Sequence, residues 1–148
     1  MNNICFIIPK GYPIIAEKGF PKFGGSEVKQ IILAIALRDR GYNVFIITDD
    51  YGQEEFSKHK GLHIIKLCPK IITLIKGKFY WQLYYFWRAI RLSKCDIIFQ
   101  RAAGPITGVI ALFCKLQRKK FIYFVASSQD VDKKYIKNTT LRILILHN

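Results

Sequence analysis

Short apolar runs alternate with segments of helical length along most of this chain. The first run, residues 4–9, is uninterrupted and ends at a proline, which is typical of a strand buried on both faces of a parallel sheet. Further strands are predicted at residues 43–48, 62–67, 96–100 and 120–125. Because strands that alternate with helices need right-handed crossovers, we expect an α/β domain with a doubly wound, mostly parallel sheet.

Helices are predicted at residues 26–40, 79–93 and 105–116, and loops at residues 10–25 and 49–60. Ser26 is expected to cap the start of the first helix, where Glu27 favours the positive end of the helix dipole. Gly41 is expected to end this helix, because glycine tolerates a positive φ.

The end of the chain predicts a domain that continues elsewhere. Residues 133–146 have the pattern of another helix, but no strand follows it. Sheets of this class commonly hold about five or six strands, so a carboxyl-terminal partner segment is expected to be missing. We therefore treat residues 1–148 as one domain that is truncated at its carboxyl end.

The composition limits the kinds of partner and location that suit this chain. The 24 Lys and Arg outnumber the 10 Asp and Glu, so the formal net charge is +14, and this favours polyanions or a membrane surface. The longest uncharged apolar stretch, residues 102–114, is shorter than the ~18 residues that span a bilayer, and no signal peptide is evident. We expect a cytoplasmic protein that does not cross the membrane.

The cysteines predict neither a metal site nor a redox centre. Cys5, Cys68, Cys95 and Cys114 are widely separated, and no two of them form a C-x-x-C pair. Cys5 and Cys114 lie within apolar runs, where a thiol is usually a small buried side chain. No metal is therefore required by the sequence.

A pair of glycines between the first strand and the first helix is the sharpest functional signal. In the segment F-G-G-S-E, Gly24 and Gly25 leave the backbone bare, and the N–H groups from Ser26 onward favour a phosphate. A Gly-Gly pair alone is more often a turn, but its position at a helix start favours a ligand site. The spacing matches neither the Walker loop nor the dinucleotide fingerprint, which disfavours ATPase and NAD functions.

These motifs resemble the amino-terminal domain of the family-4 glycosyltransferases of GT-B fold, in which a loop leads to a Gly-Gly-x-Glu helix start. The resemblance is carried by residues 23–48, 96–114 and 120–132, about half of the chain, while residues 51–94 are similar only in general plan. It implies a Rossmann-like domain that forms half of a GT-B architecture, with the donor-binding carboxyl-terminal domain absent.

The resemblance also implies an activity. Such a two-domain enzyme transfers a sugar from a nucleotide-diphosphate sugar to a saccharide or lipid-linked acceptor, with retention at the anomeric carbon, in cell-surface glycan biosynthesis. This chain would be the acceptor-side half, and we expect it to be nearly inactive alone. No cofactor beyond the nucleotide-sugar donor is implied.

Site residues follow from the same resemblance. Gly24, Gly25 and Ser26 would approach the donor, and Arg101 and Asp130 would line the same cleft after two later strands. A local ion pair is the alternative role for Arg101, and a helix cap is the alternative for Asp130. The family often has a histidine where this chain has residues 127–129, Ser-Ser-Gln, so no catalytic residue is assigned.

The basic, aromatic region at residues 70–94 leaves two interpretations open. It is either a core helix with solvated lysines or a surface that contacts anionic lipid at the inner face of the membrane. Interleaved cations and aromatics also suit RNA, although no RNA- or DNA-binding motif is present and no nucleic acid is expected. The alternative function is therefore a non-catalytic basic module that binds RNA or anionic lipid.

Overall fold

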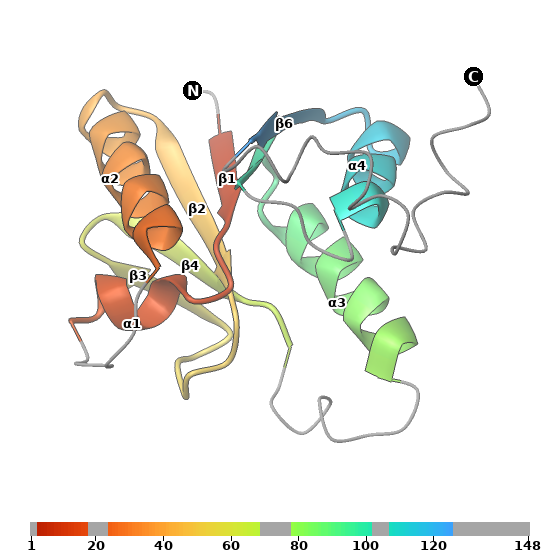
Figure 1. The fold of residues 1–148 in the computed structure, drawn as a ribbon, viewed down its shortest axis with the longest axis horizontal. Helices are drawn as coiled ribbons and strands as arrows, with labels where there is room; N and C mark the ends of the chain where they lie inside the picture. The colour runs from red at the N-terminus through yellow and green to blue at the C-terminus, as the bar shows by residue number, and fades with distance from the viewer. Residues whose placement is uncertain (1–2, 18–23, 69–77, 102–106, 126–148) are drawn as a thin grey trace.

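The computed structural model describes residues 3–17, 24–68, 78–101 and 107–125, which form a six-stranded sheet with helices on both faces (Figure 1). The strands are β1 Asn3–Ile7, β2 Asn43–Thr48, β3 Phe56–His59, β4 Leu62–Lys66, β5 Ile97–Arg101 and β6 Lys120–Phe124. The helices are α1 Gly11–Ile15, α2 Gly25–Asp39, α3 Lys78–Leu92 and α4 Thr107–Leu116. The predicted doubly wound α/β fold is confirmed.

The sheet order is β3-β4-β2-β1-β5-β6, and all neighbouring strands are parallel except the antiparallel pair β3 and β4. β1 lies in the middle, where Ile4 pairs with Val44 on one side and with Ile97 on the other. This central place explains the uninterrupted apolar run of β1, because both faces of the strand are covered.

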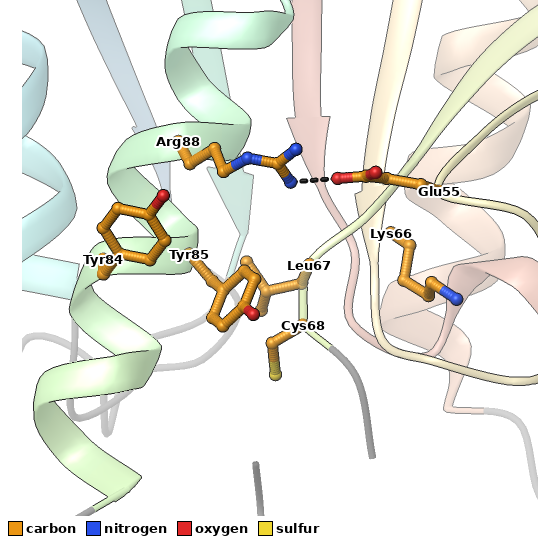
Figure 2. A pocket seen from close by; sticks show the side chains of 7 residues that line it. All are labelled: Glu55, Lys66, Leu67, Cys68, Tyr84, Tyr85 and Arg88. Atoms are coloured by element: carbon orange, nitrogen blue, oxygen red, sulfur yellow. Dashed lines mark hydrogen bonds and ion pairs between the residues drawn. The ribbon is translucent and has the colours of Figure 1, made fainter. Parts of the chain in front are cut away.

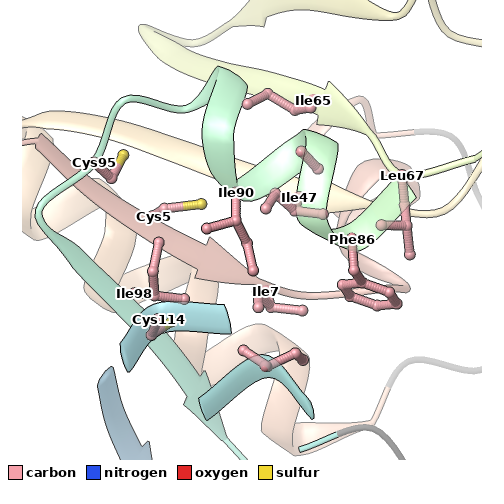
Figure 3. Packing of buried hydrophobic residues seen from close by; sticks show 12 residues of the cluster. Cys5, Ile7, Ile47, Ile65, Leu67, Phe86, Ile90, Cys95, Ile98 and Cys114 are labelled. Carbon is pink, nitrogen blue, oxygen red and sulfur yellow. The ribbon is translucent and has the colours of Figure 1, made fainter. Parts of the chain in front are cut away.

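Two hydrophobic cores lie on opposite faces of the sheet. On one face, Ile31 and Ala34 of α2 pack with Tyr12 of α1 against the strands. On the other face, Phe86 and Ile90 of α3 pack with buried residues of α4, as Figure 3 shows. Each helix therefore buries one side against the sheet, as the layered α/β architecture requires.

Helix α3 packs one side into the core, as the first of the two interpretations of its region expects, and the contact with lipid stays a prediction. Phe86, Ala89 and Ile90 are buried in the core, whereas Tyr80 and Trp81 near its start are exposed. No helix among the described residues has both the length and the apolar character needed to cross a membrane.

Two predicted loops contain regular structure. The first holds α1, whose Tyr12 and Ile15 are buried, and the second holds β3, which forms a hairpin with β4. Lys60 and Gly61 connect β3 to β4 with φ of 48° and 76°, the positive values of a tight hairpin turn. Both predictions were wrong because the polar composition of these stretches concealed short elements that pack against their neighbours.

The ends of α2 follow the prediction only in part. The helix begins at Gly25 with Gly24 at the N-cap and no side-chain cap hydrogen bond, so the predicted capping role of Ser26 was wrong. Ser26 cannot cap because it already lies inside the first turn. Glu27 is in that turn as expected, and Gly41 follows the helix with a φ of 87°.

All four cysteines are free thiols, as the sequence indicated, and all four are buried, whereas burial was expected only for Cys5 and Cys114. Burial raises the pKa of the Cys114 thiol to about 11, so it stays protonated at neutral pH and is a poor nucleophile. The helix predicted at residues 133–146 and the expected truncation of the domain lie outside the described residues.

Candidate functional site

After the two central strands, β1 and β5, the chain continues on opposite faces of the sheet. The helices that follow β1 cover one face, and α4, which follows β5, covers the other (Figure 1). In open α/β sheets, such a reversal leaves a crevice beyond the carboxyl ends of the two strands, and ligands bind there. The predicted site residues Gly24, Gly25 and Arg101 lie at this edge, at the start of α2 and the end of β5.

Neither glycine at the start of α2 is required by the fold. Gly24 is extended, with φ −76° and ψ 143°, and Gly25 has no positive φ. A Cβ added to Gly25 would have no described atom within 4 Å, and one added to Gly24 would meet only the end of the Glu27 side chain. Among the described residues, nothing therefore occupies the space beside the Gly25 backbone.

The first turn of α2 offers donors beside that space. The N–H groups of Glu27 and Val28 both point to the carbonyl oxygen of Gly24, at 3.2 and 3.4 Å. The N–H groups of Gly25 and Ser26 come before these bonds, so they have no acceptor within the helix and form the positive end of its dipole. A polar or anionic group can approach them because no side chain projects from Gly25.

A partly buried carboxyl, that of Asp49, lies directly after β2. Burial raises the pKa of Asp49, and the charge of Lys10 opposes that rise. Burial also raises the pKa of the Tyr51 hydroxyl, and the carboxylates of Asp49 and Glu27 raise it further. The Tyr51 hydroxyl therefore lies within electrostatic reach both of Asp49 after β2 and of Glu27 in the first turn of α2, which the sequence analysis did not predict.

Arg101 is the last residue of β5 and is half buried. Its guanidinium lies over the ring of Phe124 in β6, 5.2 Å from the ring centre, and not in an ion pair with any described residue. Its Nε is buried and has no hydrogen-bond partner among the described residues. The alternative role of Arg101 in a local ion pair thus finds no support there.

Gln100, next to Arg101, is a site candidate that the sequence analysis missed. It is buried in β5, opposite Ile7 of β1, and its Nε2 donates to the hydroxyl of Thr107 at 3.0 Å. Its Oε1 is buried without a partner among the described residues, and such an atom normally has one. The signal was available, because Gln100 is a polar residue at the end of an apolar strand.

The remaining predicted residue, Asp130, lies outside the described residues, as does the Ser-Ser-Gln stretch before it. Among the residues that the structure describes, no group of three His, Cys, Asp or Glu side chains is placed to hold a metal ion.

The free amide oxygen of Gln100 leads to a stability prediction. Gln100→Met keeps the shape of the side chain, so we expect the free energy of unfolding to change by about 1 kcal/mol or less. The matched control is Gln53→Met, because the Gln53 amide accepts from Tyr51 N and donates to Asp49 O, both at 2.6 Å. This control should cost about 2 kcal/mol or more, since it strands two partners. If urea titrations gave equal losses in the free energy of unfolding for the two variants, the Gln100 amide would stabilise the fold itself.

Comparisons with known proteins find a solved structure of similar fold but no related sequence. No family model and no curated protein matches the chain. Among solved structures, a sucrose-phosphate synthase from Thermosynechococcus elongatus is similar over 93% of this chain, with a TM-score of 0.62 and 19% sequence identity. The chain spans only 39% of the length of that structure. The likeness shows the fold, a Rossmann-like domain that corresponds to half of a GT-B architecture.

Proposed function

We propose that this chain is the amino-terminal, acceptor-side domain of a glycosyltransferase that uses a nucleotide-sugar donor. The observation that carries the proposal is Gly25: a Cβ added there would meet no described atom within 4 Å, although the backbone conformation does not require a glycine. A residue without a side chain at the start of a helix, beside the switch point of the sheet, suits close approach by a ligand.

The charges at the helix start favour different parts of the proposed donor at two positions. The Glu27 carboxylate lies beside Gly24, where it would repel a phosphate and accept hydrogen bonds from sugar hydroxyls. The N–H groups of Gly25 and Ser26 are donors at the positive end of the helix dipole and suit a phosphate oxygen. Arg101 Nε, buried and unpartnered among the described residues, could hydrogen-bond a ligand in the crevice. Gln100 Oε1 is likewise unpartnered among these residues, but successive side chains of a strand point to opposite faces, so Gln100 points toward α4 and away from α2.

The other half of the active site would come from a second domain. The GT-B likeness covers 39% of the neighbouring structure, which leaves room for such a domain in the complete protein. We propose that the second domain supplies most contacts to the nucleotide and that the anomeric configuration is retained. We assign no catalytic residue and no cofactor besides the donor.

The acceptor is proposed to be a saccharide or a lipid-linked saccharide, used at the cytoplasmic face of a membrane during cell-surface glycan synthesis. Tyr80 and Trp81 are exposed at the start of α3, and the chain carries a net charge of +14. Aromatic and basic side chains together suit the interface of an anionic bilayer, where each basic residue adds about 1 kcal/mol.

The test uses the complete polypeptide that contains this chain, incubated with UDP-, GDP- and ADP-sugars. We expect release of nucleoside diphosphate from one donor class, stimulated by a saccharide or lipid-linked acceptor, and almost none from residues 1–148 alone. No release from any donor, together with salt-sensitive binding of RNA or anionic vesicles, would favour the non-catalytic basic module.

A further inference from the structure

A hollow opens at the carboxyl edge of the sheet, where β4 ends. This cavity of about 450 Å³ lies between the end of β4 and helix α3 (Figure 2). Its volume falls in the range of about 300–1,000 Å³ that is typical of small-molecule sites. Leu67 and Cys68, which follow β4, form its apolar part.

The charged groups of the cavity are paired. The Glu55 carboxylate accepts a hydrogen bond from the guanidinium of Arg88, which lowers the pKa of Glu55 and raises that of Arg88. Lys66 donates to the carbonyl oxygen of Gln53 at 2.9 Å and lies 3.7 Å from the Asp50 carboxylate. The two cations are thus balanced by two carboxylates, so the cavity does not select a bare anion.

Two aromatic rings of α3 complete the lining. Tyr84 and Tyr85 contact each other edge to face, with ring centres 5.4 Å apart, and Tyr84 remains 53% exposed. An exposed tyrosine ring offers an apolar face and a polar hydroxyl at low entropic cost. Beside it, the Glu55–Arg88 ion pair offers both acceptors and donors to a ligand rich in hydroxyl groups.

We propose that this cavity binds a neutral saccharide of one or two pyranose rings, stacked on Tyr84 and hydrogen-bonded through vicinal hydroxyls to Glu55 and Arg88. The inference rests on the proposed function, in which the saccharide is the acceptor. A pyranose matches the cavity because its C–H face is apolar while its hydroxyls both donate and accept. The paired charges favour a neutral sugar over a phosphorylated one.

The test applies the folded 148-residue chain to an array of neutral mono- and oligosaccharides, with inorganic phosphate and phosphorylated hexoses as anionic probes. We expect capture of at least one neutral glycan, and a loss of tenfold or more in affinity for Tyr84→Leu and Arg88→Met. The controls are Tyr42→Leu, just before β2, and Arg91→Met on α3, because both residues are exposed and neither lines the cavity. These variants should bind the captured glycan like the wild type.

Several outcomes would overturn the inference. They are capture of no neutral glycan, preference for the anionic probes, and equal effects in the test and control variants. In the complete protein, Arg88→Met should raise the KM for the acceptor about tenfold with little change in kcat. Sugar transfer with an unchanged KM would overturn the cavity assignment alone, whereas glycan binding without any response to sugar nucleotides would overturn the proposed function alone.

Discussion

Gly25→Val in the complete protein is expected to lower sugar transfer by about 100-fold or more, because small displacements of a bound substrate can cost that much in rate. A valine at this position would project into the open space beside the first turn of α2, where we place the donor. Its Cβ would have no described atom within 4 Å, so the free energy of unfolding should change by about 0.5 kcal/mol or less.

The matched control for this variant is Lys29→Val. It places the same branched side chain at an exposed position one turn further along α2, where it replaces a lysine. It should keep nearly all of the transfer activity. Initial rates with the preferred sugar nucleotide, together with urea unfolding, measure both quantities. Wild-type turnover of Gly25→Val, or equal losses in the two variants, would remove the donor from this helix start.

The position of this site could be predicted from the sequence, although its detail could not. The apolar run before Gly24 and the helical spacing after it place the glycine pair between the first strand and a long helix, and the structure has Gly24 and Gly25 at the start of α2, with the short helix α1 between them and β1. The sequence does not show that Glu27 folds back beside Gly24, because that contact depends on the helix beginning at Gly25 and not after Ser26.

The sequence analysis missed α1 and β3 for the same physical reason. The helix α1 and the strand β3 are five and four residues long, too short for a periodic pattern to show. Tyr12 and Ile15 are buried by tertiary packing against the sheet, and β3 is held by pairing with β4. Such elements are stabilised by neighbours distant in sequence, so local propensity does not reveal them.

The cavity between β4 and α3 illustrates the same limit for a candidate site. Glu55 lies before β3, Lys66 ends β4, and Tyr84 and Arg88 lie on α3. No short motif joins these residues, and only the fold brings the ion pair of Glu55 and Arg88 beside the tyrosines. The aromatic character of α3 was evident from the sequence, but its division into buried and exposed residues required the structure.

Phe6→Ala is expected to have the largest effect on folding. Phe6 lies in the central strand β1, is 0% exposed, and has its ring centre 4.9 Å from that of Phe99 in β5. Removing a fully buried ring costs about 3–5 kcal/mol, whereas a domain of ordinary stability has about 5–15 kcal/mol in total. The variant should therefore unfold at a much lower urea concentration, or fail to fold.

The same substitution at Phe56 separates burial from residue type. Phe56 lies on β3 at the end of the strand order and is 52% exposed, so Phe56→Ala should cost about 1 kcal/mol or less. Urea titrations followed by circular dichroism give both free energies where the transitions are two-state. Similar losses in the two variants would contradict the central position of β1, and with it the crevice between β1 and β5 in which the donor is proposed to bind.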